Sequence, residues 1–421
     1  MDLLISKKNE VYLKVEAEPH LNYELADFFT FEVESAKFMQ KKRRYKGWDG
    51  KIRLYSPATG EIYCGLVDYL TDWAEEKGYQ YSIEEHENFG HPQETNEFVT
   101  PEAVGQFVKS LRVPFPVRDY QYKAIYEALR YNRRLLLSPT ASGKSLMIYA
   151  LIRYHTNVCR NVLVVVPTTS LVEQMYKDFA DYGWDVGSYC HKIYAGKERQ
   201  TDSQVIITTW QSIYKLPRKY FERFSVVVGD EAHQFKSKSL ISIMTKLGNA
   251  KYRYGFTGTL DGTQTHKWVL EGLFGPSYKI IKTDELMKKG HVATLDINVL
   301  LLKHPPNKFE TFEDEIQYII THTRRNNFIR NLALDLKGNT LILFARVEGH
   351  GEPLYNLINS NSIIDRHVFF VHGGVATEDR ERVREITESE NNAIIVASYG
   401  TFSTGINIKN LHNIIFASPS K

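Results

Sequence analysis

Short, wholly apolar runs alternate with helical stretches through most of this chain of 421 residues, and this alternation limits the possible folds most strongly. From about residue 112 the runs are rich in Val, Ile and Leu on both faces, which is typical of parallel strands covered by helices on both sides. The pattern predicts a doubly wound α/β domain. Its expected strands are RLLLS (134–138), NVLVVVP (161–167), QVIITT (204–209), FSVVVGD (224–230) and YRYGFTG (252–258).

The same alternation returns after about residue 295, so we expect a second α/β domain directly after the first. The boundaries that we predict for the two domains are 101–290 and 291–421. The expected strands of the second domain are NTLILFA (339–345), HVFFVHG (367–373), NAIIVAS (392–398) and HNIIFAS (412–418).

The first part of the chain is rich in aromatic residues and mixes strand-like with helical stretches, which favours a small α+β accessory domain. Residues 51–57 alternate like one strand that stops at Pro57. Residues 66–78 are typical of an amphipathic helix that ends at a glycine. The acidic stretch 84–99 has no periodicity and is expected to be a linker, so we assign 1–100 to this domain and its linker.

The composition excludes several classes of protein. Hydrophobic residues make up 43% of the chain, charged residues 24%, and the formal net charge is only +3, so a uniformly basic protein is excluded. The three cysteines have no metal-ligand spacing and predict a reducing compartment. No apolar stretch approaches the roughly 20 residues that a membrane span needs. We therefore expect a monomer in the cytoplasm, without a membrane partner.

The segment SPTASGKS (138–145) lies between an apolar run and the helical stretch LMIYALIRYH, which is the context of a phosphate-binding loop. Backbone N–H groups of such a loop and of the helix start bind phosphate oxygens. Lys144 is expected to reach the β- and γ-phosphates, and the Ser145 hydroxyl to bind Mg²⁺. Ser138 departs from the glycine usual at the first position. The predicted phosphate-binding residues are Ser138, Pro139, Thr140, Ala141, Ser142, Gly143, Lys144 and Ser145.

A second candidate for nucleotide chemistry is GDEAHQ (229–234), at the carboxyl end of another apolar run. Parallel α/β sheets bind their ligands at this edge. Asp230 suits a Mg²⁺ contact, and Glu231 is placed to orient and deprotonate an attacking water. His233 is not needed to bind the nucleotide, so we expect it to sense the γ-phosphate and to couple that state to neighbouring elements.

The tetrapeptide RDYQ (118–121) precedes the expected strand that leads to the phosphate loop. Gln121 carries both a donor and an acceptor for an adenine edge. Arg118 and Tyr120 are expected to frame the base. An ordinary helix start is the alternative interpretation of this segment.

Together these blocks resemble the motifs of superfamily 2 helicases of the DExH type. The resemblance covers roughly residues 112–421 and implies two tandem RecA-like domains that close on ATP and Mg²⁺ while they grip a nucleic acid strand. The further matching segments, in the order of the family, are VPTTSLVEQ (166–174), TTWQS (208–212), FTGTL (256–260), LFARVEGHG (343–351), VHGG (371–374) and SYGTFSTGINI (398–408).

The resemblance implies that short hydroxyl side chains at strand ends bind phosphates of the nucleic acid without reading its sequence. Trp210 is a candidate for stacking on a base, although a core aromatic residue is an equal alternative. Thr257 and Thr259 are implied to relay, with His233, between the nucleotide and the strand. The implied nucleic-acid contacts are Thr168, Thr169, Thr208, Thr209, Trp210, Arg346, Thr401, Ser403 and Thr404.

Within this superfamily the motifs and residues 28–54 resemble the recombination helicases of T-even bacteriophages. That resemblance implies an enzyme that remodels D-loops, R-loops, Holliday junctions and stalled forks, with single-stranded DNA, branched DNA and RNA–DNA hybrids as partners. An RNA helicase, a translocating subunit of a restriction system and an ATP-independent annealing protein remain alternatives, because a motor that follows phosphates reads little sequence.

The arginine-bearing motif that usually closes the second RecA-like domain has no match here. We expect it to follow Lys421 in a longer form of the protein. The arginines of that motif stabilise charge on the transferred phosphoryl group, so we expect this chain to bind ATP and DNA but to hydrolyse ATP weakly.

The segment 37–53 carries eight Lys and Arg residues against one Asp, with aromatic side chains between them. This combination suits phosphate neutralisation and base stacking, so we predict that it binds duplex or junction DNA. Replacing Arg43 and Arg44 by Glu should weaken binding of branched DNA and flatten its dependence on salt, because fewer counterions are released. Fluorescence anisotropy over a salt series measures both quantities, and unchanged affinity and slope would refute the prediction.

Overall fold

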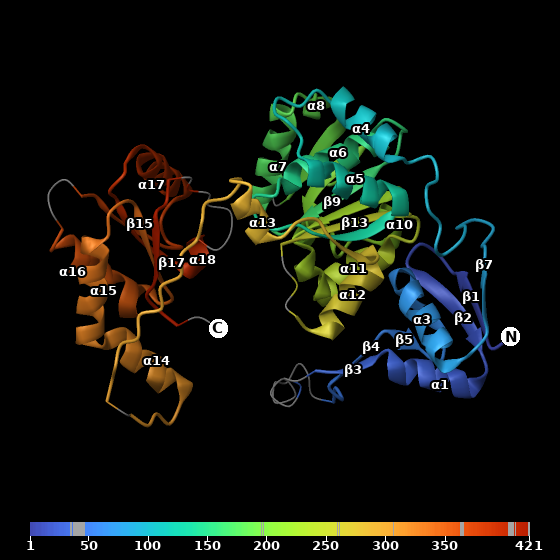
Figure 1. The fold of residues 1–421 in the computed structure, drawn as a ribbon, viewed down its shortest axis with the longest axis horizontal. Helices are drawn as coiled ribbons and strands as arrows, with labels where there is room; N and C mark the ends of the chain where they lie inside the picture. The colour runs from blue at the N-terminus through green and yellow to red at the C-terminus, as the bar shows by residue number, and fades with distance from the viewer. Residues whose placement is uncertain are drawn as a thin grey trace. The chain divides into compact units, whose positions relative to one another are not determined.

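The computed structural model forms two compact units, Met1–Leu295 and Asp296–Lys421, which Figure 1 shows along the chain. None of the helices that the model describes is long and apolar enough to cross a membrane. The model describes residues 1–33, 36, 47–194, 196, 198–258, 260, 262–305, 307–362, 366–402, 408 and 410–419.

A five-stranded mixed sheet in the order β5-β6-β2-β1-β7 forms the start of the first unit. Strand β1 pairs antiparallel with β2 and parallel with β7, so the sheet is not of the doubly wound type. Two helices pack on it, and the second ends at a left-handed glycine, Gly78, as its sequence predicted. The elements are β1 (Leu3–Lys7), β2 (Tyr12–Ala17), α1 (Pro19–Phe28), β5 (Tyr55–Ser56), β6 (Glu61–Tyr63), η2 (Cys64–Leu66), α3 (Val67–Lys77) and β7 (Tyr81–Glu84).

The single strand expected over residues 51–57 is divided between two sheets. Strand β4 (Lys51–Arg53) pairs with β3 (Thr30–Glu32) in a separate hairpin, whereas the next residues form β5 of the mixed sheet. Leu54 lies between them, buried, with its N–H donating to the Phe29 carbonyl. The alternation of the sequence is thus continuous, but burial of Leu54 bends the chain from one sheet to the other.

The first unit also contains a seven-stranded parallel sheet in the order β10-β11-β9-β12-β13-β8-β14. All five strands predicted for this domain are present, while the short edge strands β10 and β14 were not predicted. The strands are β8 (Arg133–Leu137), β9 (Val162–Val166), β10 (Cys190–Ile193), β11 (Val205–Thr209), β12 (Val226–Asp230), β13 (Tyr252–Thr257) and β14 (Ser277–Lys279).

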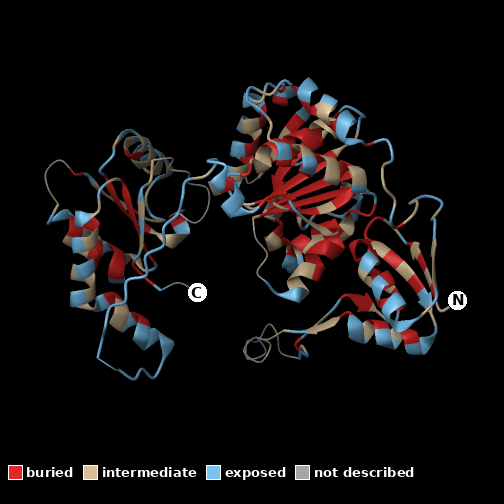
Figure 2. Ribbon diagram, in the orientation of Figure 1, coloured by how far each residue is buried: buried red, intermediate tan, exposed pale blue. Residues whose placement is uncertain are grey.

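Helices cover both faces of this sheet, so its central strands are almost fully buried (Figure 2). The helices that contribute to one core are α4 (Pro101–Ser110), α5 (Asp119–Tyr131), α6 (Lys144–Thr156), α7 (Thr169–Asp181), α8 (Val186–Tyr189) and α13 (Thr283–Lys288). The helices that contribute to the other are α9 (Trp210–Ile213), α10 (Arg218–Phe221), η3 (Ala232–Lys236), α11 (Lys238–Lys246) and α12 (Gln264–Phe274).

The second unit contains a four-stranded parallel sheet in the order β16-β17-β15-β18. The predicted α/β fold class is therefore confirmed for both parallel sheets, although the boundary proposed near residue 100 stays a prediction. The elements are α14 (Phe312–Thr321), α15 (Thr323–Asp335), β15 (Thr340–Phe344), η4 (Val347–Gly351), α16 (Glu352–Asn359), β16 (Val368–Val371), α17 (Thr377–Ser389), β17 (Ile394–Ser398), α18 (Tyr399–Phe402) and β18 (Asn413–Phe416).

The mixed sheet and the seven-stranded sheet share one continuous apolar core. Trp268 of α12 is nearly buried, and its ring lies 5.4 Å from that of Phe29 and 4.4 Å from that of Tyr69. The Tyr69 hydroxyl donates to Glu271 Oε2 at 2.7 Å. Gly65 approaches so closely that a Cβ there would lie 1.9 Å from the Glu271 carbonyl oxygen. The accessory sheet is therefore packed rigidly against the first RecA-like sheet.

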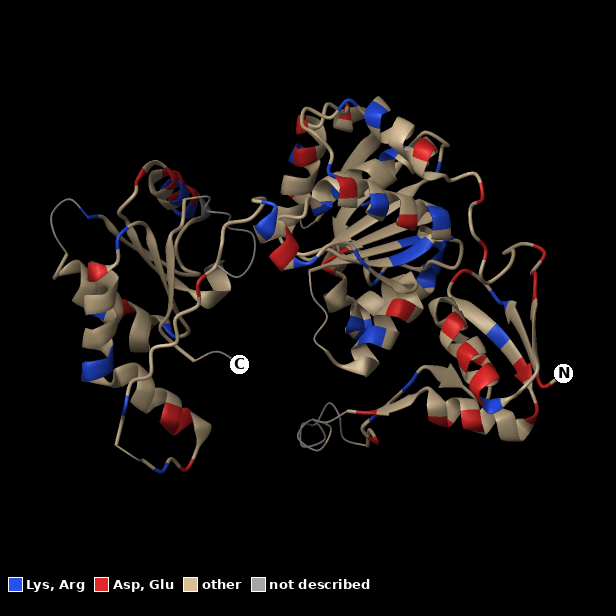
Figure 3. Cartoon of the chain, viewed as in Figure 1, with Lys and Arg blue, Asp and Glu red and all other residues tan. Residues whose placement is uncertain are grey.

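A buried ionic cluster lies within the same interface. Glu10 accepts hydrogen bonds from Lys7 and from Arg133 at the start of β8, where basic residues gather on the sheet (Figure 3). All three side chains are at least nine-tenths buried. Burial would raise the pKa of Glu10, but Arg133 and Lys7 hold it below its ordinary value. The carboxylate is thus ionised and pairs with both buried cations, offsetting one of their two charges, while Lys7 also donates to the Phe89 carbonyl at 2.7 Å.

Replacing Glu10 by Ala should lower the free energy of unfolding by about 3–5 kcal/mol, because Lys7 and Arg133 would stay buried without their carboxylate. Urea denaturation followed by tryptophan fluorescence measures the change. Glu61 is the control, since it pairs with Lys8, whose side chain is half exposed. Glu61→Ala should cost less than about 1 kcal/mol. Equal effects of both substitutions would contradict a special role of the buried cluster.

Candidate nucleotide site

The predicted phosphate loop lies between the end of β8 and the start of α6. Ala141 and Gly143 adopt left-handed backbone angles, with φ of 62° and 83°. The positive φ favours glycine at position 143, and a Cβ there would lie 2.2 Å from Gln121 Nε2 and would displace that amide. Ser138 is fully buried and its hydroxyl bonds that of Ser142, which closes the loop across its base. A serine is thereby accommodated where the usual pattern has glycine.

Lys144 meets both acidic residues of the second motif. Its ammonium donates to Glu231 Oε1 at 2.7 Å and lies 3.9 Å from Asp230 Oδ1. Strands β8 and β12 end at the same edge of the sheet, which brings these residues together although they are far apart in sequence. Glu231 has a left-handed φ of 50°, a strained conformation for a side chain of this type. Such strain is common where a reactive group must be aimed.

Two groups of the site suit a hard cation such as Mg²⁺. Asp230 is 8% exposed, and burial raises the pKa of its carboxyl against the opposing charge of Lys144. Burial likewise raises the pKa of Asp178, while a hydrogen bond with Ser145 lowers it. A Ser145 hydroxyl that donates its proton to Asp178 keeps its lone pairs for a metal. The described residues contain no cluster of three or more ligating side chains. This fits Mg²⁺, which takes one or two carboxylates and otherwise binds phosphate and water.

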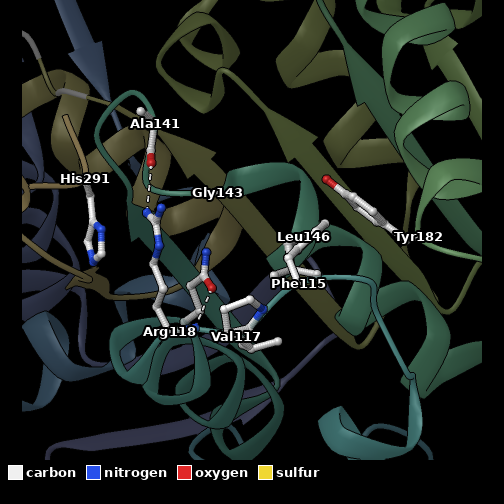
Figure 4. A pocket seen from close by; sticks show the side chains of 10 residues that line it. Phe115, Val117, Arg118, Ala141, Gly143, Leu146, Tyr182 and His291 are labelled. Atoms are coloured by element: carbon white, nitrogen blue, oxygen red, sulfur yellow. Dashed lines mark hydrogen bonds between the residues drawn. The ribbon is translucent and has the colours of Figure 1, made fainter. Parts of the chain in front are cut away.

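A cavity of about 410 Å³ adjoins the phosphate loop (Figure 4), a size common among ligand pockets. Its walls are largely apolar. Arg118 lines it and donates to the Ala141 carbonyl at 3.3 Å. The residues that line the cavity are Phe115, Pro116, Val117, Arg118, Gln121, Ala141, Gly143, Leu146, Tyr182 and His291.

The structure changes the roles predicted for Tyr120 and Gln121. Tyr120 is 4% exposed and packs in the core, with its hydroxyl accepting from Arg118 Nη1, so it does not frame the base. Phe115 and Tyr182 provide aromatic walls instead, in edge contact at 5.4 Å. Gln121 lines the cavity, but its amide already bonds the Ser142 carbonyl and the Arg118 N–H. Gln121 therefore braces the phosphate loop.

His233 and Thr257 are in direct contact. His233 Nδ1 lies 3.1 Å from Thr257 Oγ1 and 3.4 Å from Glu231 Oε2. Thr257 is fully buried at the end of β13, and its carbonyl accepts from the Ser138 N–H at 2.7 Å. The phosphate loop, the acidic motif and the end of β13 thus form one connected group. Thr259 lies outside the described residues.

The predicted nucleic-acid contacts of the first unit follow two neighbouring strands. Thr168 caps α7, and Thr169 beside it is exposed. Thr209 is nearly buried and pairs with Ser212, while Trp210 is half-buried with its ring edge-on to Tyr214. The role predicted for Thr208 requires correction. Thr208 is fully buried and donates to the Ile193 carbonyl at 2.9 Å, so it joins two strands and we do not retain it as a DNA contact.

In the second unit, Arg346 bonds Glu313 and Gln317 of α14, and Thr401 bonds Ser398 at the end of β17. Burial leaves Thr401 8% exposed. The remaining predicted contacts, Arg43, Arg44, Ser403 and Thr404, lie outside the described residues.

Two family models match this chain. One, described as "DNA helicase UvsW, N-terminal", matches residues 2–84, and the other, "Type III restriction enzyme, res subunit", matches residues 114–262. The first match coincides with the mixed sheet, and the second contains the phosphate loop and the acidic motif.

Several known proteins are similar to this chain. The ATP-dependent DNA helicase uvsW of Enterobacteria phage T4 is 32% identical over 99% of this chain and 84% of its own length. The DNA 3'-5' translocase XPB2 of Sulfurisphaera tokodaii is 27% identical over 53% of this chain and 49% of its own. The crystal structure of T4 UvsW matches all of this chain and 85% of that one, with a TM-score of 0.60 and 29% identity. The chain therefore belongs to the UvsW family of ATP-dependent DNA helicases in superfamily 2.

Proposed function

We propose that this protein uses ATP and Mg²⁺ to remodel branched DNA, and that the site at the ends of β8, β12 and β13 hydrolyses the nucleotide. The contact of Lys144 with Glu231 and Asp230 carries the first part of this proposal, because it joins a phosphate-binding group to two carboxylates beside a cavity of suitable size. The cavity between Phe115, Leu146 and Tyr182 receives the adenine base.

Each group then has a role that follows from its chemistry. Lys144 moves from Glu231 to the β- and γ-phosphates, which carry more negative charge than one carboxylate. The released Glu231 orients a water for attack on the γ-phosphorus and accepts its proton, while the bond from the γ-phosphorus to the β–γ bridging oxygen breaks and ADP leaves. Asp230 and Ser145 would hold Mg²⁺, which would supply neutralisation of the negative charge on the phosphate oxygens.

The contact between His233 and Thr257 supports a role in coupling. His233 is close enough to Glu231 to respond when Lys144 leaves that carboxylate, and Thr257 passes the change to the phosphate loop and to the end of β13. A single DNA strand runs over Thr168, Thr169, Thr209 and Trp210 in the first unit. Arg346, Thr401, Ser403 and Thr404 provide the contacts of the second.

D-loops, R-loops, Holliday junctions and stalled forks are the substrates that we propose. The accessory sheet supports this, because its match to the UvsW N-terminal model lies on a domain packed rigidly against the motor. The basic segment 37–53 belongs to the same domain, and we propose that it binds the duplex part of a branched substrate. RNA–DNA hybrids are included because phosphate contacts read little sequence.

Lys144→Ala should reduce ATP affinity by at least about tenfold, because a charge-assisted contact to the phosphates is lost. Glu231→Gln should keep the affinity and lower the hydrolysis rate by roughly 10²–10⁴-fold, as expected for loss of a general base. Calorimetric titration and a phosphate-release assay separate the two effects. Normal turnover in Glu231→Gln would remove Glu231 from the chemistry.

ATPase stimulation and strand separation should be strongest with forked or three-stranded DNA. Single-stranded DNA, linear duplex and single-stranded RNA of matched length are the comparisons. Stronger stimulation by RNA would favour an RNA helicase, and tracking on linear duplex without separation would favour a translocase. Strand annealing without ATP that survives Lys144→Ala would favour an annealing protein.

Thr257→Val should reduce the stimulation of ATPase activity by DNA several-fold while basal ATP affinity stays near that of the wild type. The substitution conserves volume but removes the hydroxyl that contacts His233. Steady-state ATPase assays with and without DNA measure the ratio. Thr209→Val is a control of the same chemistry, because it removes a hydroxyl that bonds Ser212. This control should weaken DNA binding rather than coupling. Equal stimulation in wild type and Thr257→Val would contradict the relay.

A further inference from the structure

One wall of the base cavity comes from a residue outside all the helicase-like segments of the sequence. His291 lines the cavity together with Arg118 and Leu146, and its side chain is exposed there. Figure 4 shows its ring on one side of the Arg118 side chain, with Val117 and Leu146 on the other. The imidazole is therefore available to a ligand in the cavity.

The backbone holds His291 firmly at this place. Helix α13 ends at Lys288 and is followed by Gly290, whose φ is 69°, and the His291 N–H donates back to the Leu286 carbonyl at 2.9 Å. This is a glycine-closed helix end of the Schellman type. Leu286 is fully buried in the core of the first unit, and Val292 packs against the same core. His291 is thus fixed between two anchored residues while its own ring faces the cavity.

A second contact ties this segment to the helix that carries Gln121. The Lys289 ammonium lies 3.4 Å from the Asp119 carboxylate and 5.9 Å from the centre of the Tyr120 ring. An exposed ion pair of this kind contributes at most about 1 kcal/mol. Its effect is to orient the segment rather than to stabilise the fold.

The chemistry of the cavity indicates which part of ATP reaches His291. Lys144 and the loop amides hold phosphates at one end, whereas the rest of the cavity has apolar and aromatic walls. A flat, apolar-faced purine suits such walls, and an imidazole stacks readily on it. We propose that His291 binds the base of ATP by packing its ring against the purine as a wall of the cavity. This rests on the proposed function, because it requires ATP to occupy the cavity.

The proposal also connects the nucleotide with the chain that leads onward. The first unit ends at Leu295, only a few residues after His291. A base held by His291 restrains the beginning of the segment that continues into the second unit. Binding of the base therefore restrains this segment independently of binding of the phosphates.

The test compares ATP with inorganic tripolyphosphate, which has the phosphates but no base, by calorimetric titration of the full chain. His291→Ala should weaken ATP binding about 3- to 10-fold, the range expected for loss of one aromatic contact. His291→Phe keeps a ring and should stay within about twofold of wild type. Neither variant should change binding of tripolyphosphate. His20→Ala, at an exposed histidine of helix α1, is the matched control and should bind both ligands normally.

Unchanged ATP affinity in His291→Ala would overturn the proposal, and so would an equal loss for ATP and tripolyphosphate. A loss in His291→Phe as large as in His291→Ala would overturn packing by the ring. Lys144→Ala tests the nucleotide site itself, because this substitution should weaken the binding of both ATP and tripolyphosphate. If Lys144→Ala binds both ligands as the wild type does, the nucleotide site itself is misplaced, whatever the His291 variants show.

Discussion

Burial of the seven-stranded sheet on both faces is the constraint on which the rest of the structure depends. A strand covered from both sides tolerates a charged side chain only where buried partners satisfy it, because burying an unpaired charge is costly. Backbone carbonyls satisfy Arg253 of β13 in this way. The polar groups of the site lie at the carboxyl edge of the sheet, where Lys144 of α6 meets Asp230 at the end of β12, and Thr257 ends the neighbouring β13. The site is a consequence of how the sheet is packed.

At the opposite edge of the same sheet, a buried charged side chain is paired with a side chain of opposite charge. Arg133 stands at the start of β8 and would be a buried, uncompensated cation if the accessory sheet did not supply Glu10. The apolar contacts around Trp268 and the close approach at Gly65 then leave little freedom between the two sheets. The accessory sheet is thus bonded to the start of β8, opposite the carboxyl edge that carries the phosphate loop, and both sheets belong to one compact unit.

In the cavity beside the phosphate loop, a side chain expected to bind a base forms its hydrogen bonds with the protein backbone instead. Gln121 has the donor and the acceptor that an adenine edge would need, yet both are occupied by the phosphate loop and the helix start. Gly143 leaves the space that this amide fills. The amide therefore sets the shape of the loop, and the surfaces offered to a base come from Phe115, Leu146, Tyr182 and His291.

The sequence by itself determined the fold class, the order of the domains and the position of the phosphate loop and acidic motif. These follow from local periodicity and from motifs whose residues are neighbours in the chain, so no distant contact is needed to find them. The tertiary structure decided which side chains are accessible. Thr208 and Tyr120 have suitable chemistry but are buried, His291 belongs to no motif but lines the cavity, and Leu54 divides an apparently continuous strand. Exposure depends on elements that pack from far along the chain, and no local pattern records it.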